Sequence, residues 1–509
     1  MNKSSGGLPA GWALPAVEDV CVVTQGQSPP GDTYNTTQDG MPFFQGKAEF
    51  GDVYPAPVKW CNAPTKLAEP EDVLISIRAP VGPTNLAPAK CCIGRGLAAI
   101  RPLAGAPSRY FLYVLRATVA ELTAKATGST FEAISGRDLR SHRIPLAPLP
   151  EQRRIVAEIE KHFTRLDAAV AALERTRANL KRYRASVLKA ACEGRLVPTE
   201  AELARAEGRD YEPADVLLER VLQERRTKWE ADQLERMKTA GKQPKDDKWK
   251  SKYQEPVAPD TNDLPELPEG WAWATVDQAS LSVQYGSSAK TNEDDEGVPV
   301  LRMGNIVDGR LDTGNLKYLP TEHREFPELL LSNGDLLFNR TNSAELVGKS
   351  AVYGGHPAPC SFASYLIRVR PASSVAPDFL AYYMNSPHGR TWIRSVVSQQ
   401  VGQANVNGTK LKASRIPLPP RLEQWRIVEE VERRISVLNE LDAVAELAVR
   451  RAERLRQAIL KRAFEGKLVP QHPNDEPASV LLERIRAERK EEAVQAIPHR
   501  KRRAGRKTT

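Results

Sequence analysis

The sequence has no run of about 20 consecutive apolar residues, the length that a membrane-spanning helix requires. Its opening segment, MNKSSGGLPAGW, also lacks the apolar core of a signal peptide. Cysteine is scarce: there are six among 509 residues and no Cys-x-x-Cys pair, which argues against a zinc site and favours reduced structural thiols. We therefore expect a cytoplasmic protein without a membrane segment or a bound metal.

Motifs of the common catalytic classes are missing as well. An adenine methyltransferase should carry Asn/Asp-Pro-Pro-aromatic, whereas Ser28-Pro-Pro-Gly offers neither an amide nor an aromatic ring. A phosphate-binding loop requires G-x-x-x-x-G-K-[ST]; Gly348-Lys349-Ser350 ends in this way, but Ser343 stands where the first glycine should be. No hydrolase or dinucleotide motif stands in a fitting context. The sequence therefore predicts a chain that is not an enzyme by itself.

The composition is that of a folded protein, with 41% hydrophobic and 27% charged residues. A length of 509 residues suggests several domains. Lys and Arg number 73 against 64 Asp and Glu, which gives a net charge of +9. This basic excess permits binding to a polyanion but does not identify one.

An internal repeat organises the chain. Residues 143–198 align without a gap onto residues 415–470, with 25 identities in 56 positions. LPAGW at 8–12 likewise matches LPEGW at 267–271. Shared composition cannot produce such matches, so the chain contains two copies of one unit.

Each copy combines a globular domain with a long helix. Ile159, Leu166, Leu173, Leu180 and Val187 recur every seven residues, which is typical of a helix packed against another helix. Upstream, short runs rich in β-forming residues alternate with turns and predict α+β domains. We expect a globular domain over 1–150, a long helix over 151–198, a helical and charged linker over 199–266, a second globular domain over 267–420, a second long helix over 421–470, and a C-terminal helix with a basic tail over 471–509.

Polar side chains suited to DNA follow the predicted strands at corresponding places in the two domains. Arg can bind guanine bidentately and Asn or Gln can bind adenine, whereas Ser and Thr suit phosphates. In this alignment Arg78 stands against Arg340. Each residue alone is best interpreted as an ordinary turn residue, but their recurrence favours DNA binding. The candidates are Gln45, Lys47, Arg78, Ser129, Thr130, Phe131, Arg302, Asn305, Arg340, Asn342, Gln403 and Asn405.

These residues resemble one family, the specificity subunit of Type I restriction-modification systems. The resemblance rests on the repeated LP-x-GW opening, GRGLAAIRP at 94–102, NRTNSAELVGK at 339–349 and the block from IPLPP to EGKLVP. It implies two α/β target-recognition domains in tandem, separated by two long helices that pack as an antiparallel coiled coil with pseudo-twofold symmetry. It also implies an asymmetric bipartite target on double-stranded DNA.

The same resemblance implies partners. The chain would bind two modification subunits, which methylate adenine with S-adenosylmethionine, and restriction subunits, which use ATP and magnesium. No cofactor would be bound by this chain itself. The corners that end the long helices are candidate partner-binding sites, although helix termination alone also explains their glycines. These candidates are Gly194, Leu196, Val197, Gly466, Leu468 and Val469.

Two other functions stay open at this point. The chain could be a coiled-coil scaffold without catalytic activity that binds protein partners, or an enzyme in its own right. Loss of a bipartite methylation pattern on deletion of the chain would favour DNA recognition, and turnover by the purified chain would favour an enzyme.

Overall fold

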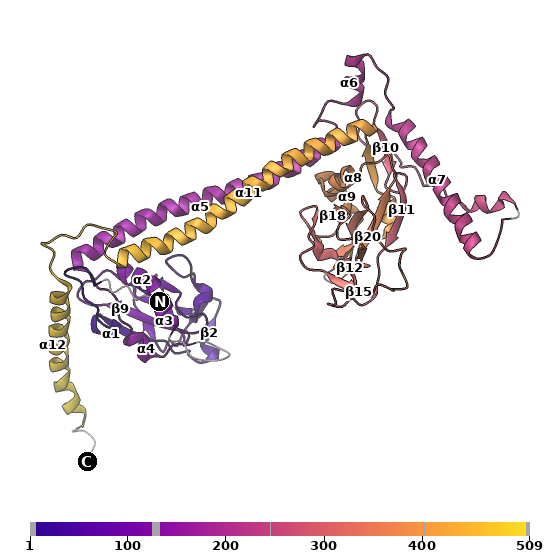
Figure 1. Cartoon of the computed structure of the whole chain (residues 1–509). Helices are drawn as coiled ribbons and strands as arrows, with labels where there is room; N and C mark the ends of the chain where they lie inside the picture. Colours follow the sequence, from indigo (N-terminus) through magenta and orange to yellow (C-terminus); the bar gives the residue numbers. More distant parts are fainter. Residues whose placement is uncertain (1–6, 125–132, 245, 401–402, 505–509) are drawn as a thin grey trace. The chain divides into compact units, whose positions relative to one another are not determined.

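The computed structural model describes residues 7–124, 133–244, 246–400 and 403–504 (Figure 1). The chain divides into two compact units. Unit 1 contains residues 1–174 and 446–509, and unit 2 contains residues 175–445. Within the described residues, no helix is long and apolar enough to cross a membrane.

The globular domain of unit 1, domain 1, combines two sheets with short helices. Its first sheet is antiparallel, in the order β1 (Cys21–Gln25), β9 (Leu97–Pro102), β6 (Val73–Ser76) and β7 (Thr84–Leu86). Its second sheet has the order β2 (Tyr34–Asn35), β4 (Lys59–Cys61), β3 (Met41–Phe44), β8 (Cys91–Ile93) and β5 (Leu67–Ala68). Its helices are α1 (Val17–Val20), η1 (Gly31–Thr33), η2 (Lys47–Glu49), α2 (Ser108–Ala117), α3 (Val119–Thr123) and α4 (Gly136–Arg140).

The globular domain of unit 2, domain 2, repeats this construction. Its main sheet has the order β11 (Ser280–Tyr285), β20 (Leu366–Pro371), β16 (Leu336–Asn339) and β18 (Ser350–Val352). The smaller sheets contain β15 (Lys317–Leu319), β12 (Val298–Leu301) and β19 (Ser361–Phe362); β17 (Thr341–Asn342), β22 (Gln403–Asn405) and β21 (Ser398–Gln400); β10 (Ala272–Thr275) and β23 (Arg415–Leu418); and β13 (Ile306–Val307) and β14 (Arg310–Leu311). Its helices are η4 (Met303–Asn305), α8 (Pro377–Asn385), α9 (Pro387–Val396) and α10 (Gly408–Lys412).

Two helices of 44 residues, α5 (Leu149–Cys192) and α11 (Arg421–Phe464), follow the domains. In unit 2, Arg177 on α5 donates to Asp442 on α11 at 2.8 Å. In unit 1, Asp167 pairs with Arg456. Further along α5 in unit 2, Arg184 donates to Asn439, so numbers rise along one helix as they fall along the other and the helices are antiparallel in this unit. The expected α+β fold with two long helices that pack against each other is confirmed.

The first turn of each long helix is joined to its domain by a buried hydrogen bond. The Trp12 indole N–H donates to Glu151 at 3.0 Å, and Trp271 donates to Glu423 at 2.9 Å. Glu423 also accepts the backbone N–H of Glu200 at 2.8 Å. Burial raises the pKa of the Glu423 carboxyl, so this group depends on its donors for its charged form. The tryptophan of the repeated LP-x-GW motif and the glutamate in the first turn of the long helix thus form the same contact in both units.

Replacing Trp271 with Phe should therefore destabilise unit 2. The ring keeps its edge contact with Phe379, but Glu423 loses one of its two donors, which costs about 1–3 kcal/mol. Urea denaturation followed by circular dichroism measures this cost. Trp273→Phe is the matched control, because the partly exposed Trp273 donates only to the carbonyl of Pro265 at 3.2 Å. An equal cost for both variants would show that the Glu423 joint has no special role.

A further helix follows each long helix and packs on the domain of the same unit. The helices are α7 (Ala214–Thr239) in unit 2, preceded by α6 (Glu200–Glu207) and followed by η3 (Asp247–Lys252), and α12 (Ala478–Ala504) in unit 1. Ala214 donates its N–H to the carbonyl of Gly270, and Ala478 donates to Gly11, both at 2.8 Å. Domain 1 is thus covered by a helix from the far end of the chain.

Candidate nucleic-acid interface

Strand ends of domain 1 surround a cavity of about 240 Å³. Gln45 and Lys47 follow β3, Arg78 follows β6, and Arg95 lies between β8 and β9. All four side chains are exposed. No carboxylate lines the cavity, and Lys47, Arg78 and Arg95 make no ion pair with any residue that the structure describes. Unpaired cations around a hollow form a site for an anion.

Glycines hold the loops of this cavity together. A Cβ at Gly96 would lie 2.4 Å from the carbonyl oxygen of Gln45, and one at Gly26 would lie 2.1 Å from that of Gly94. Gly94 also donates its N–H to Phe44 at 2.8 Å. Only glycine permits these approaches, so the sequence itself positions Gln45 beside Arg95.

The same strand ends of domain 2 surround a cavity of about 530 Å³. Arg302 and Asn305 follow β12, Lys290 lies beyond β11, and Tyr365 precedes β20. The Tyr365 ring is 49% exposed. This cavity therefore combines two cations and one carboxylate, Asp312, with an exposed aromatic ring, and it differs in chemistry from the cavity of domain 1.

Backbone geometry shows that the two cavities correspond. A Cβ at Gly286, after β11, would lie 2.5 Å from the carbonyl oxygen of Ala363, as a Cβ at Gly26 would lie 2.1 Å from that of Gly94 in domain 1. Ser287 donates to Phe362 at 2.9 Å, as Gln27 donates to Ile93 at 3.0 Å. One backbone framework thus presents different side chains at equivalent positions.

Two of the predicted residues in domain 2 support each other. Asn305 is only 5% exposed; its amide donates to the carbonyls of Asp312 and Asn315, and its oxygen accepts the N–H of Arg302 at 2.8 Å. The guanidinium of Arg302 reaches the Asn315 carbonyl at 3.2 Å. Asn305 therefore shapes the loop that carries Arg302, and contact of either residue with DNA stays a prediction.

The remaining predicted residues of domain 2 meet near the small sheet of β17, β22 and β21. Arg340 lies over the Tyr285 ring, 4.9 Å from its centroid, and donates to the Ser364 carbonyl at 3.2 Å. Asn342 pairs with Ala404 in the sheet, and Asn405 donates to Thr341 at 2.7 Å. The exposed Gln403 lies on the same strand as Asn405. The structure therefore brings Arg340, Asn342, Gln403 and Asn405 together.

The pairing of Arg78 with Arg340 is wrong by one residue. Ser76 pairs with Leu97 in domain 1, and Asn339 pairs with Leu366 in domain 2. Arg340 therefore corresponds to Ile77, and Arg78 corresponds to Thr341. Because side chains alternate along a strand, this shift places the two arginines on different sides of the backbone.

The sequence prediction missed Arg95, Lys290 and Tyr365. Arg95 could have been found, because two glycines flank it in GRGLAAIRP and mark a close backbone approach. Nothing in the sequence singled out Lys290 or Tyr365. Ser129, Thr130 and Phe131 lie outside the described residues.

The predicted partner-binding corners pack on the domains. Gly194 and Gly466 have φ values of +65° and +68°, which favour glycine. A Cβ at Gly194 would lie 2.5 Å from Pro268, and one at Gly466 would lie 2.3 Å from Pro9. The partly buried residues beyond them, Leu196, Val197, Leu468 and Val469, pack against the cores of their units. These corners join helix to domain, and a role in partner binding stays a prediction.

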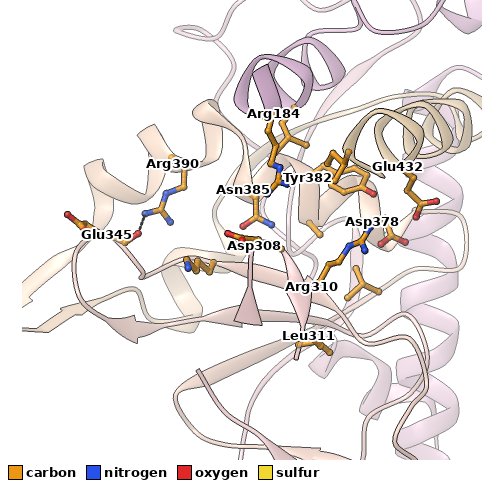
Figure 2. Close-up of a pocket in the computed structure, with 16 residues that line it drawn as sticks. Arg184, Asp308, Arg310, Leu311, Glu345, Asp378, Tyr382, Asn385, Arg390 and Glu432 are labelled. Carbon is orange, nitrogen blue, oxygen red and sulfur yellow. Dashed lines mark hydrogen bonds between the residues drawn. The ribbon is translucent and has the colours of Figure 1, made fainter. Parts of the chain in front are cut away.

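A further cavity, of about 350 Å³, lies between domain 2 and the helices of unit 2 (Figure 2). Asp378, Tyr382 and Glu432 gather at one end of it (Figure 2). Burial, and next the nearby Glu432, raise the pKa of Asp378. Four acidic and four basic side chains line this cavity. Its balanced charge suits a polyanion less well than the cavities at the strand ends do.

The described residues contain no group of three or more His, Cys, Asp or Glu side chains that could hold a metal ion. All six cysteines are buried as free thiols. Burial raises the pKa of Cys91, Cys192 and Cys360 to about 12, which keeps these thiols protonated.

Comparison with known proteins gives consistent matches. The family model described as Type I restriction modification DNA specificity domain matches residues 9–179 and 284–447. The Type I restriction enzyme EcoKI specificity subunit of Escherichia coli strain K12 is 25% identical over 96% of this chain and 97% of its own length. The putative type I restriction enzyme MjaX specificity subunit of Methanocaldococcus jannaschii is 43% identical, over 30% of this chain and 37% of that protein.

A solved chain described as "Structural basis underlying complex assembly and conformational transition of the type I R-M system" has a TM-score of 0.59 and 21% identity. The match covers 91% of this chain and 99% of that chain. It shows that the two chains share a fold.

Proposed function

Because the chain belongs to the family of Type I restriction-modification DNA specificity proteins, it is a DNA target-recognition subunit, and we propose that its two domains read the two unlike halves of one bipartite target. The observation that carries this proposal is the pair of corresponding cavities at the strand ends. Their backbone is shared, but Arg78 and Arg95 line one cavity, and Arg302 and Tyr365 line the other. Different side chains on one framework suit two different short sequences.

The proposed partners are two modification subunits that methylate adenine with S-adenosylmethionine and restriction subunits that require ATP and magnesium. Helix α11 offers a surface for such partners, because it exposes several large apolar side chains at helical spacing. These side chains are Val437, Leu441, Val444, Leu447 and Leu455. A scaffold that binds only protein is not favoured, because it would leave the cationic cavities without a ligand.

We also propose that the chain alone is not catalytic and that it is cytoplasmic. The sequence lacks the Asn/Asp-Pro-Pro-aromatic motif of an adenine methyltransferase and a complete phosphate-binding loop. Both chemistries would come from the partner subunits.

Deleting the chain from its host tests this function. Adenine methylation at a motif of two short half-sites with an unread gap should disappear from the genome and return on complementation. Long-read sequencing of modified bases measures both outcomes. A bipartite pattern that survives the deletion would contradict the proposal, and turnover by the purified chain without partners would contradict the absence of catalysis.

A further inference from the structure

A basic arm extends from domain 2 (Figure 1). It consists of residues 222–253, which include the second part of α7 and η3. Ala214, Leu217 and Val221 are buried, but no residue from Leu222 to Thr239 is buried. This part of α7 is therefore not required to cover the core of domain 2.

Aromatic packing folds the arm back on itself. Trp229 on α7 stacks on Trp249 of η3 with ring centroids 6.0 Å apart, and Tyr253 lies 5.3 Å from Trp229. Trp249 is buried as a result. The segment that the sequence suggests to be a charged linker thus has an ordered attachment to the helix.

The arm is rich in positive charge. It contains ten Lys and Arg residues and six Asp and Glu residues, which give it +4 of the chain's net charge of +9. Lys228, Lys238, Lys242 and Lys252 are exposed and make no ion pair with any residue in the described part of the chain. Arg236 approaches Glu328 only at 3.9 Å, and both side chains are 71% exposed, so water and salt screen this pair.

A groove of about 690 Å³ separates the arm from the main sheet of domain 2. Six basic and two acidic side chains line it. Lys228, Arg236 and Lys252 come from the arm, and Arg368 and Arg370 come from β20 on the opposite wall. Asp335 forms ion pairs with both of these arginines and Arg368 is only 3% exposed, so the free positive charge of the groove comes from the arm. In domain 1, the residue that corresponds to Arg368 is Ala99, which carries no charge.

We propose that this groove binds backbone phosphates of double-stranded DNA beside the half-site that domain 2 reads. The inference rests on the proposed function and assigns a second, sequence-independent contact to domain 2. Strand β11 and the residues just after it link the two sites. Ser282 and Gln284 line the groove, and Ser287 lines the domain 2 cavity that contains Arg302 and Tyr365. Three residues of strand span about 10 Å, which is a short step along a DNA backbone.

The aromatic residues of the arm favour a duplex over single strands. Trp229 contacts Trp249 and Tyr253, and the ring faces that meet in these contacts are not platforms for unpaired bases. What the groove presents is spaced cations, which suit phosphates whose positions do not depend on sequence.

The triple variant Lys228→Gln, Arg236→Gln and Lys252→Gln tests the proposal. Binding of the full chain in its methyltransferase complex is measured by fluorescence anisotropy over a range of salt concentrations. One duplex carries the target with about 15 flanking base pairs on the side of domain 2, and the other ends at the half-site. The variant should bind the flanked duplex about tenfold or more weakly, and its salt slope should fall by about 2–3, since each phosphate contributes about 0.9. Binding of the truncated duplex should change little.

A random-sequence duplex serves as a second probe, so that failure of the proposed function and failure of this inference can be told apart. The variant should lose affinity for it even if no specific target exists. The matched control is Lys59→Gln, Lys66→Gln and Lys90→Gln, which removes equal charge from exposed positions of domain 1 that line neither cavity nor groove. An equal loss in the control, or unchanged DNA binding with weaker assembly of partner subunits, would overturn the proposal.

Discussion

Replacing Lys47, Arg78 and Arg95 with alanine should weaken binding of the complete target at least about 100-fold, because charged contacts to bases and phosphates contribute about 1–3 kcal/mol each. The three side chains line one cavity, have no ion-pair partner among the described residues and are exposed. Their loss should remove recognition of one half-site without unfolding domain 1.

The half-site dependence makes this prediction specific. The unmodified chain should lose affinity when either half of the target is mutated. The triple variant should become insensitive to mutation of the half that domain 1 reads and stay sensitive to the other half. Titration of four duplexes, with neither, one or both halves mutated, measures this difference.

A matched control uses three other lysines of domain 1. Lys59, Lys66 and Lys90 are exposed and do not line the cavity. Their replacement removes the same charge but should reduce affinity less than about tenfold, through general electrostatic attraction alone. If both triple variants lost discrimination equally, the cavity would not be the reading site.

The sequence predicts the repeat, the long helices and the strand ends, because each depends on local patterns. The heptad through Ile159 and Leu166 and the glycines around Arg95 are examples. The sequence does not predict which residues pair between strands that are distant along the chain. Alignment drift across loops hides the one-residue shift at Arg340, which depends on backbone hydrogen bonds between β16 and β20.

The attachment of the basic arm and the docking of α12 were also beyond the sequence. Trp229 and Trp249 are 20 residues apart and belong to no repeated motif, so nothing local indicated that they stack. EPADVLLERV at 212–221 matches EPASVLLERI at 476–485, which indicates equivalent helices but does not say which domain each one covers. Such non-local contacts depend on tertiary packing rather than on residue propensity.

Exchanging domain 1 for that of another family member should replace one half-site completely and leave the other unchanged. The structure places the exchange boundary after Pro148. Ala13 and Leu146 exchange backbone hydrogen bonds of 3.0 and 2.9 Å, and Val17 donates to His142. A boundary at residue 142 would separate Ala13 from Leu146, whereas one before α5 keeps both pairs within the same piece.

The incoming domain meets the rest of unit 1 through both backbone and side chains, which share one hydrophobic core. Ala478 of α12 binds the carbonyl of Gly11, and Arg489 binds that of Cys21 at 3.0 Å. Any sequence supplies these carbonyls. The incoming domain must also supply side chains that fit the two long helices. These are Trp12, which donates to Glu151, Tyr110, which packs edge-on against Phe464, and Tyr113, which packs edge-on against Phe163.

Modified-base sequencing of cells that carry the exchanged chain measures the outcome. The half-site of domain 2 should be kept because its cavity, its joint at Trp271 and Glu423, and helix α7 all lie within unit 2. A half-site that changes on both sides would mean that the two cavities do not read independently. Loss of all methylation with the chain still folded would instead place part of the reading surface of domain 2 in residues 8–148, which contradicts two self-contained reading sites.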